Sequence, residues 1–352
     1  MFKTKVIQID PGNPDPVKID EAADILRNGG LVAFPTETVY GLAALINHQE
    51  ARDKLSLVKE RPAGKKFSVC VYHQKQVEQL VGEVSPLAYR LMKKFWPGPL
   101  TLVLKAADQQ TIGFRFPEHS VAQALLRRLP APVFAPSANL AGKESPVRAE
   151  DVLKDLNGKI DAVIDSGKSA LGIVSTVCAV DQDKIEILRP GAISEEILLE
   201  ESKVKNILFV CTGNSCRSPM AEGLMKKIIG DNKYINVSSA GIAAYDGMRA
   251  SREAIDVLRQ EGINISEHRA RQVNVDMVKD SDYILVMEQR HKRWIIDKFP
   301  FAQERIFALR EFDPENNGNL SIPDPIGLDL RFYEQVAAVI KDSIERLVAK
   351  IQ

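Results

Sequence analysis

The hydrophobic pattern of this chain changes once, near residues 194–205, and that change sets its organisation. Before it, strand and helix patterns follow one another irregularly. After it, short apolar strands alternate regularly with amphipathic helices. The 352 residues are enough for two domains of ordinary size. We therefore expect two domains, residues 1–202 and 203–352, each large enough to bury its own core.

Composition restricts the class of protein and the kinds of partner. Lys and Arg number 47, as do Asp and Glu, so the formal charge is zero, which disfavours nucleic-acid binding through bulk charge. The longest apolar runs, such as 207–211, are far shorter than the ~18 residues that cross a bilayer. Four cysteines without a CxxC pair make neither a disulfide framework nor a zinc site. We expect a cytoplasmic protein without a metal centre and without a membrane partner.

The second half is expected to be a doubly wound α/β domain. Its pattern predicts strands at 207–210, 237–240 and 283–287, and helices at 219–229, 251–260, 291–299 and 332–350. Such alternation is typical of a parallel sheet with helices on both faces. Ligands of these sheets bind at the carboxyl ends of the strands.

The first half has a less regular order. Its pattern predicts helices at 19–28, 87–95 and 121–129, and strands at 31–34, 100–104 and 133–135. Prolines follow or interrupt several of these segments. This mixture favours an α+β domain or an α/β domain with a mixed sheet.

A strand-to-helix loop in the second half carries the clearest chemical signature. Cys211 ends the strand, and Pro219 is suited to the first position of the following helix. Backbone amides at the start of a helix, together with the Arg217 guanidinium, can hold an anion. Positive surroundings of this kind lower a thiol pKa to about 3.5–7.5. Cys211 is therefore the expected nucleophile.

Further residues complete this candidate site. Gly213 and Asn214 can adopt the left-handed backbone of a tight turn. Asp324 lies in a proline-bounded loop and could protonate a leaving group, then activate water. Cys216 is either a packing residue or a partner that protects oxidised Cys211 as a disulfide. The remaining predicted residues of the phosphate loop are Thr212, Ser215 and Ser218.

The Cys211–Pro219 segment with the distant Asp324-Pro325 pair resembles the low-molecular-weight protein-tyrosine-phosphatase family, over residues 205–352. The resemblance implies that Cys211 is the nucleophile, Arg217 the phosphate clamp and Asp324 the acid, with no cofactor. Tyrosine-specific members usually carry aromatic residues where this chain has Ile326-Gly327. Ser215 is closer to the threonine of arginine-phosphatase members than to the apolar residue of tyrosine-specific members. The implied substrate is a phosphotyrosine or phosphoarginine protein.

The first half lacks both standard nucleotide-phosphate loops, G-x-x-x-x-G-K-[ST] and G-x-G-x-x-G. Instead, polar residues gather beside prolines, glycines and predicted strand ends. A cation inside an apolar strand, such as Arg115, should be paired or bind a ligand. Cations with hydroxyl and amide groups can hold a triphosphate and a carboxylate together. The segments concerned are 36–41, 59–66, 114–117, 135–139, 175–176 and 189–191.

Seven motifs in the same order make residues 5–200 similar to the YrdC-like threonylcarbamoyl-AMP synthase family. They begin at Pro35, Lys59, Phe95, Arg115, Pro136, Ser175 and Arg189. The resemblance implies a twisted mixed α/β sheet that converts L-threonine, bicarbonate and ATP, with Mg²⁺, into threonylcarbamoyl-AMP and pyrophosphate for tRNA modification. It implies threonine contacts from Thr36, Arg115, Ser137 and Ser175. It implies ATP contacts from Lys59, Arg61, Thr111, Asn139 and Arg189.

The expected protein is thus a bifunctional enzyme, and other interpretations remain open. The first half could be a binding module for RNA or nucleotide without catalysis. A carbamoyl-transfer domain of the hydrogenase-maturation type is disfavoured, because those domains carry zinc-finger cysteines that this chain lacks. Two departures from the synthase pattern stand out: Lys66-Phe67 replaces a usual Pro-Leu pair, and Cys70 replaces a frequent histidine.

Overall fold

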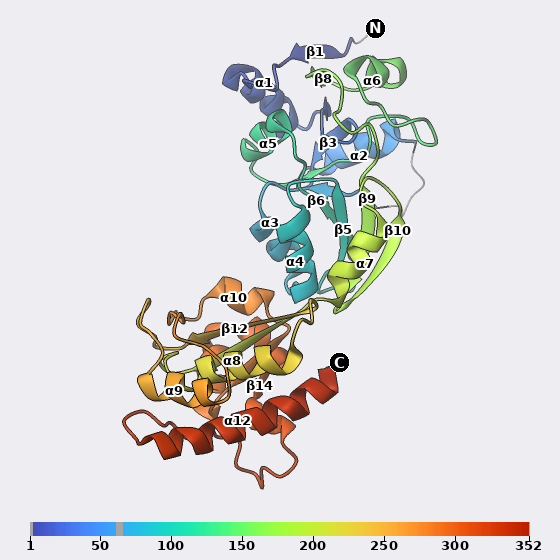
Figure 1. Ribbon diagram of the computed structural model, residues 1–352. Coiled ribbons are helices and arrows are strands. Elements are labelled where there is room, and N and C mark those ends of the chain that lie inside the picture. The colour runs from blue at the N-terminus through green and yellow to red at the C-terminus, as the bar shows by residue number, and fades with distance from the viewer. Residues whose placement is uncertain (1–2, 61–65, 352) are drawn as a thin grey trace. The chain divides into compact units, whose positions relative to one another are not determined.

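The structure, a computed structural model, describes residues 3–60 and 66–351. The chain forms two compact units, Met1–Ser202 and Lys203–Gln352, coloured from blue to green and from yellow to red in Figure 1. Within the described ranges, no helix combines the length and the apolarity that crossing a membrane requires.

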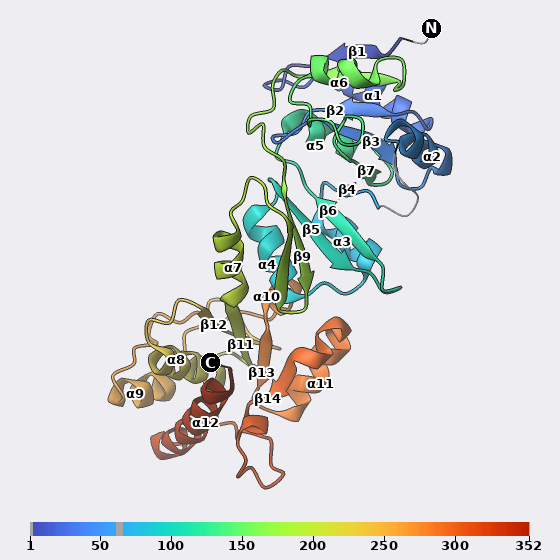
Figure 2. The same cartoon turned by 90° about the vertical axis from the view of Figure 1, so that its right-hand side faces the viewer.

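A mixed sheet of ten strands organises the first unit, in the order β1-β8-β2-β3-β7-β4-β6-β5-β9-β10 (Figure 2). The sheet contains both parallel pairs, such as β5–β9, and antiparallel pairs, such as β5–β6, so the expected mixed α/β sheet is confirmed. The strands are β1 Lys5–Gln8, β2 Val32–Phe34, β3 Gly41–Leu45, β4 Val69–Cys70, β5 Leu100–Lys105, β6 Thr111–Arg115, β7 Val133–Phe134, β8 Ala162–Asp165, β9 Thr176–Asp181 and β10 Lys184–Arg189.

Local sequence signals set the helix ends of this unit. Asp15 caps the first helix by accepting a hydrogen bond from Val17 N, and the next residue, Pro16, needs no partner. Ser85 caps α4 in the same way. The helices are α1 Pro16–Arg27, α2 Gln49–Val58, α3 Gln74–Val81, α4 Pro86–Phe95, α5 Ser120–Arg127, α6 Ala149–Leu156 and α7 Glu195–Lys203.

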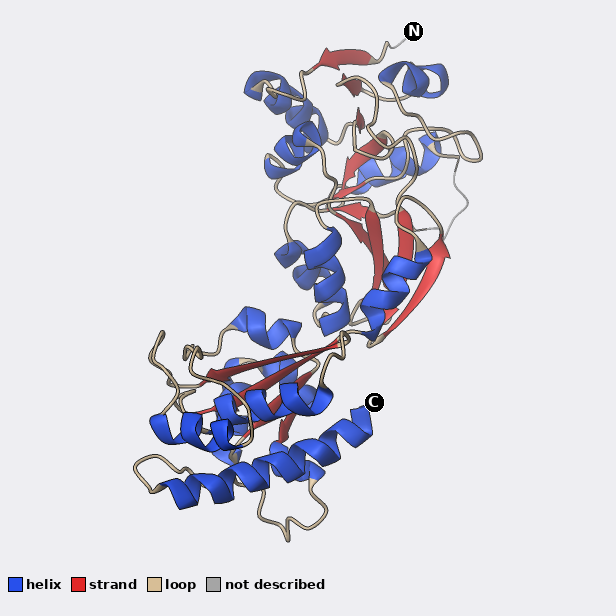
Figure 3. Cartoon of the chain, in the orientation of Figure 1, coloured by secondary structure: helices blue, strands red, loops and turns tan. Residues whose placement is uncertain are grey.

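The second unit has a parallel sheet of four strands in the order β12-β11-β13-β14. Helices cover both faces of the sheet (Figure 3), which confirms the doubly wound architecture. The strands are β11 Lys205–Cys211, β12 Ile235–Gly241, β13 Tyr283–Val286 and β14 Ile306–Ala308. The helices are α8 Arg217–Ile229, α9 Arg252–Gln260, α10 Val275–Asp280, α11 Gln289–Lys298 and α12 Leu330–Ile351, with short 3₁₀ helices η1 Pro300–Arg305 and η2 Leu309–Phe312.

The central strand β11 supplies side chains to two separate cores. Ile207 and Phe209 pack with α8, α9 and α12, whereas Leu208 and Val210 pack with α10 and α11. This division follows from the alternation of side chains along a strand. Cys211 is in phase with Phe209 and belongs to the first of these cores.

Candidate functional sites

A cleft of about 620 Å³ opens in the first unit, within the ~300–1,000 Å³ range of small-ligand sites. It is lined by residues from widely separated segments, and these include every predicted site residue that the structure describes in this unit. The predicted residues that line it are Thr36, Lys59, Thr111, Arg115, Ser137, Asn139, Ser175 and Arg189. The predicted ATP contact Arg61 lies outside the described residues.

Alternate residues of the neighbouring strands β5 and β6 form the floor of this cleft. Thr111, Gly113 and Arg115 alternate along β6 and therefore share one face. Their partners across the β5–β6 ladder include Thr101 opposite Arg115 and Val103 opposite Gly113. Regular strand geometry, rather than a flexible loop, thus sets the spacing of these groups.

Arg115 is nearly buried, at 8% exposure, and is partly neutralised. One Nη atom lies 2.9 Å from Glu37 Oε1 and donates to Thr36 Oγ1 at 3.3 Å. Glu37 in turn accepts a hydrogen bond from Glu118 N. Arg115 Nε is buried without a hydrogen-bond partner in the described part of the chain. The guanidinium therefore retains a donor for an oxygen ligand.

A second cation lies beside Arg115. Arg189 donates to the backbone oxygen of Ser175 at 2.7 Å and to Ser175 Oγ at 3.0 Å. Ser175 Oγ also lies 2.8 Å from Thr101 Oγ1. Burial, and next the charge of Arg115, lowers the pKa of Arg189. Two guanidinium groups and two hydroxyls thus form one end of the cleft.

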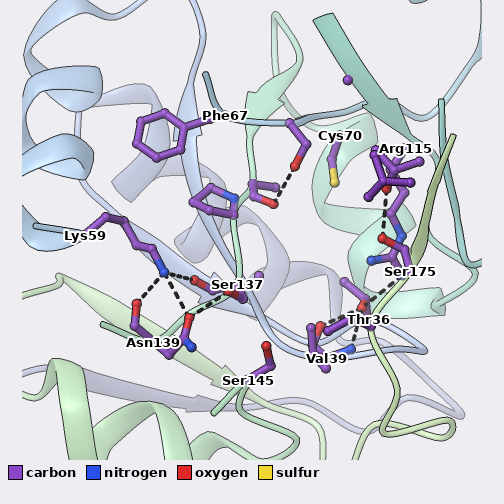
Figure 4. Close-up of a pocket in the computed structure, with 18 of the residues that line it drawn as sticks. Thr36, Val39, Lys59, Phe67, Cys70, Arg115, Ser137, Asn139, Ser145 and Ser175 are labelled. Atoms are coloured by element: carbon purple, nitrogen blue, oxygen red, sulfur yellow. Dashed lines mark hydrogen bonds between the residues drawn. The ribbon is translucent and has the colours of Figure 1, made fainter. Parts of the chain in front are cut away.

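Lys59 holds the opposite wall, as Figure 4 shows. Its ammonium donates to Ser137 O at 2.7 Å, to Asn139 Oδ1 at 2.9 Å and to Asn139 O. Asn139 Nδ2 continues the network to Lys143 O and Glu144 O. These bonds fix the loop 137–145 against the end of α2.

Sequence reasoning missed several lining residues, notably Thr101, Lys143 and Ser145. Thr101 could have been found, because it occupies the strand motif that begins at Phe95. Cys70 also lines the cleft, and burial raises its pKa to about 12. Its thiol is therefore expected to be unreactive at neutral pH.

Gly191 allows close packing beneath this site. A Cβ atom there would lie 2.5 Å from backbone atoms of Val174, Ser175 and Thr176. Gly191→Ala is therefore expected to displace Ser175 and to cost about 1–3 kcal/mol of stability. Thermal unfolding measures this loss. Gly12→Ala is the control, since its nearest atom is a side-chain oxygen at 3.3 Å; equal behaviour of the two variants would contradict this account.

The candidate nucleophile of the second unit lies at the carboxyl end of β11. Cys211 Sγ is 3.0 Å from Ser218 Oγ and accepts a hydrogen bond from Asn214 N at 3.3 Å. Helix α8 begins at Arg217, so the expectation that Pro219 takes the first helical position is wrong. The chain enters the helix two residues earlier, and Pro219 is still tolerated because the first helical N–H groups have no intrahelical partner.

Asn214 forms the turn of this loop. Its φ is 54°, so of the two residues able to adopt a left-handed backbone, Asn214 does so and Gly213 does not. The reason lies in the Asn214 side chain, which donates to Ser218 Oγ and Ser239 Oγ, each at 2.9 Å, and accepts from Arg271 N at 3.0 Å. These bonds stabilise a conformation that a residue other than glycine rarely adopts.

Arg217 joins three distant parts of the second unit. It is 1% exposed, and its Nη1 lies 2.5 Å from Glu288 Oε1 and 3.0 Å from Ile322 O. Its Nη2 pairs with Asp324, so the structure brings the predicted clamp and the predicted acid together. Arg217 Nε is buried without a partner among the residues described, and it is thus a free donor for an anion.

Glu288 is a site residue that the sequence analysis missed. It follows β13 and pairs with both Arg217 and Arg290. Arg290 also donates to Thr212 Oγ1 at 3.3 Å. The sequence could have indicated Glu288, because a polar residue just beyond the carboxyl end of a parallel strand belongs to the ligand-binding edge of the sheet.

The expected low pKa of the Cys211 thiol is wrong for this arrangement. Burial raises the pKa of Cys211, although Ser218, Arg217 and Asn214 oppose the change. The physical reason is that the thiol is 3% exposed while the charge of Arg217 is matched by two carboxylates. The sequence shows the positive groups, but not the acids that neutralise them.

Removing the charge of Glu288, one of the two carboxylates that pair with Arg217, should favour the thiolate form of Cys211. In Glu288→Gln the charge of Arg217 is less compensated, so the pKa of Cys211 should fall. Alkylation by iodoacetamide near neutral pH should become several-fold faster, with its pH midpoint moved lower. Glu267→Gln removes an exposed acid that pairs only with Arg269 and serves as the control. An unchanged alkylation profile in Glu288→Gln would contradict the explanation.

Cys216 lies under the loop. Its Sγ is 3.3 Å from Tyr333 Oη and 3.5 Å from Ser215 Oγ. It belongs to the same core cluster as Cys211, and all four cysteines are free thiols. These contacts are those of a packing residue, and disulfide formation with Cys211 stays a prediction.

Comparisons with known proteins divide the chain at the same place. Residues 24–191 match the Sua5/YciO/YrdC family model, described as telomere recombination. A threonylcarbamoyl-AMP synthase of Bacillus subtilis is 42% identical over 51% of this chain, which spans only 55% of that relative's length. A putative threonylcarbamoyl-AMP synthase of Methanocaldococcus jannaschii is 32% identical over 54% of this chain and 95% of its own length. The crystal structure of P. abyssi Sua5 complexed with L-threonine has a TM-score of 0.54 and 25% identity, covering 87% of this chain and 99% of that one.

The second unit matches a different group of proteins. Residues 206–352 match the family model for low molecular weight phosphotyrosine protein phosphatases. A protein-arginine-phosphatase of Geobacillus stearothermophilus is 36% identical over 42% of this chain and 95% of its own length. A probable low molecular weight protein-tyrosine-phosphatase of Ralstonia solanacearum is 37% identical over 42% of this chain and 97% of its length.

Proposed function

Since the chain belongs to the threonylcarbamoyl-AMP synthase family in its first unit and to the low molecular weight phosphatase family in its second, we propose that it is a bifunctional enzyme. The first unit makes threonylcarbamoyl-AMP and pyrophosphate from L-threonine, bicarbonate and ATP, and this product serves tRNA modification. The second unit hydrolyses phosphotyrosine or phosphoarginine in proteins. The observation that carries the first assignment is the convergence of eight predicted residues on one cleft.

The cleft suits a reaction between an amino acid and a nucleotide. The free Nε donor of Arg115 and the hydroxyls of Thr36 and Ser175 bind the threonine carboxylate and hydroxyl. The threonine amine and bicarbonate form a carbamate with loss of water. A carbamate oxygen then attacks the α-phosphorus of ATP, and the bond to pyrophosphate breaks. The residues contribute position and charge neutralisation, which supply most of the catalysis in phosphoryl and adenylyl transfer.

Mg²⁺ is expected to arrive with the nucleotide. The described lining of the cleft includes no Asp or Glu, and no group of three His, Cys, Asp or Glu side chains in the described chain could hold a metal. Protein-bound Mg²⁺ usually has one or two carboxylate ligands besides substrate phosphates. The donors present therefore do not form a protein metal site, and the steps assigned to this chain's own residues require none.

In the second unit, the pairing of a loop thiol with Arg217 and Asp324 supports a covalent mechanism. A bound phosphoryl group replaces carboxylate as the partner of Arg217, and this releases Asp324 towards the leaving group. Cys211 loses its thiol proton to solvent, and its thiolate attacks phosphorus as the bond from phosphorus to the leaving group breaks. Asp324, which takes up a proton once it is no longer paired with Arg217, protonates the departing atom. Asp324 then takes a proton from water, which hydrolyses the cysteinyl-phosphate.

One experiment tests the synthase assignment. The protein is incubated with ATP, L-threonine and bicarbonate, and pyrophosphate release is followed. We expect release that depends on threonine. Tight nucleotide or tRNA binding with steep salt dependence, but without threonine-dependent release, would instead support the non-catalytic binding module.

A second experiment tests the substrate of the phosphatase unit. Phosphotyrosine and phosphoarginine peptides of one sequence are hydrolysed side by side, and the two kcat/KM values are compared. Activity on neither peptide would refute the phosphatase assignment. The ratio of the two values identifies the substrate class, which Ser215 and Ile326-Gly327 leave open between the two branches of the family.

A further inference from the structure

Five cations line the cleft of the first unit in the described part of the chain, and most are already matched. They are Lys59, Lys66, Arg115, Lys143 and Arg189. Arg115 pairs with Glu37, and Lys143 lies 2.7 Å from Asp155. Lys59 directs its ammonium at three oxygens of the 137–139 segment, which occupy its three donors. Among the described residues, Arg189 and Lys66 donate to neutral oxygens only.

Lys66 and Arg189 belong to different ends of the cleft. Arg189 is bonded to Ser175, beside Arg115. Lys66 instead donates to Thr111 O at 3.2 Å, at the start of β6. Thr111 and Arg115 are four residues apart on one strand, which corresponds to about 13 Å. Figure 4 agrees, since Phe67, the neighbour of Lys66, lies on the Lys59 side and away from Arg115.

At the midpoint between these two ends, β6 carries no side chain, because residue 113 is a glycine that lines the cleft. A Cβ atom there would already be in ordinary contact with Thr101, Val103 and Ser68, at 3.5–3.7 Å. A polyanion can therefore lie along β6 without meeting a side chain of residue 113. The guanidinium groups of Arg115 and Arg189 would neutralise its negative charge at one end, and the Lys66 ammonium at the other.

We propose that Lys66 binds the two phosphates of ATP that leave as pyrophosphate. This inference rests on the proposed synthase function. Threonine occupies the Arg115 end, and its carbamate attacks the α-phosphorus, so the β- and γ-phosphates extend towards Thr111. As the bond to the α-phosphorus breaks, negative charge grows on the departing pyrophosphate, and the ammonium of Lys66 neutralises it. Lys66 was not among the ATP contacts that the family resemblance implies.

Binding of three probes to Lys66→Ala tests the proposal. The affinities of ATP, inorganic pyrophosphate and AMP are measured by calorimetry on the full chain. Loss of a charge-assisted hydrogen bond to phosphate should weaken ATP and pyrophosphate roughly 10- to 100-fold. AMP, which lacks the β- and γ-phosphates, should bind within about twofold of wild type. Lys66→Arg should retain most of the affinity, because a guanidinium also holds phosphate.

Lys105→Ala is the matched control. Lys105 is the exposed ladder partner of Thr111 and does not line the cleft, so its removal changes net charge equally. Equal weakening of AMP and pyrophosphate in Lys66→Ala, or equal effects of the Lys66 and Lys105 variants, would overturn the inference. Wild-type protein that binds neither ATP nor pyrophosphate would instead refute the synthase assignment. The two failures are thereby distinguishable.

Discussion

Cys211→Ser is expected to abolish phosphatase activity while threonine-dependent pyrophosphate release continues at the wild-type rate. The Cys211 sulfur is the proposed nucleophile, and a serine hydroxyl is a much weaker one, so kcat for nitrophenyl phosphate should fall at least about 1,000-fold. The fold should persist, because a serine hydroxyl can keep the contact with Ser218 Oγ at this position. Phosphate release from nitrophenyl phosphate and pyrophosphate release from ATP are measured on the same preparation.

Cys216→Ser provides the matched control for this prediction. A serine there can still contact Tyr333, so phosphatase activity should stay within a few-fold of wild type. Substantial hydrolysis by Cys211→Ser would refute the covalent mechanism. Loss of pyrophosphate release in the same variant would show that the two activities are not independent.

Arg115→Ala should have the largest effect on the first reaction. Loss of the guanidinium removes a charge-assisted bond to the threonine carboxylate, so kcat/KM for threonine should fall at least about 100-fold. Phosphatase activity should not change. Steady-state kinetics with threonine varied at saturating ATP and bicarbonate measure the loss.

A double variant separates this effect from unfolding. Arg115→Ala alone leaves the buried Glu37 carboxylate unpaired, which costs about 3–5 kcal/mol. Arg115→Met combined with Glu37→Gln removes both charges and should recover stability, but not threonine turnover. Recovery of turnover in the double variant would show that Arg115 acts only by pairing with Glu37.

The parallel sheet of the second unit was predictable because its signals are local. Apolar strands such as 207–210 and 283–287 stand apart from amphipathic helices in the sequence, and the structure places β11 and β13 there. The thiol loop was predictable for the same reason. Each of its chemical groups lies within eight consecutive residues, from Cys211 to Ser218.

Less local features escaped prediction. Strand β4, Val69–Cys70, was not predicted, whereas β7, Val133–Phe134, lies within the predicted strand 133–135; each contains only two residues. Such short strands exist only through pairing with neighbours, so the sequence pattern cannot define the full ten-strand order. The sequence also could not tell which of Gly213 and Asn214 takes the left-handed turn, because the side-chain bonds of Asn214 reach Ser239 and Arg271, far along the chain.

The electrostatics of the thiol loop depended on residues distant in sequence. Cys211 and Arg217 belong to the same short loop, but the acids that compensate the charge of Arg217 come from positions 288 and 324. A prediction from the loop alone counts only positive groups and so places the thiol pKa too low. The first cleft shows the same limit, since a pairing of Arg115 was expected as one possibility but its partner, Glu37, was not identified.

Successive side chains of β11 face two different cores, so the position of Cys211 along the strand decides which side of the sheet its sulfur faces. Ile207, Phe209 and Cys211 share one face, so the sulfur reaches its loop only when it lies an even number of positions along the strand from these anchoring side chains. Deleting one residue upstream would turn the sulfur to the opposite side of the sheet, even though every residue of the loop would remain. Natural variants of this strand should therefore differ by substitution and rarely by length.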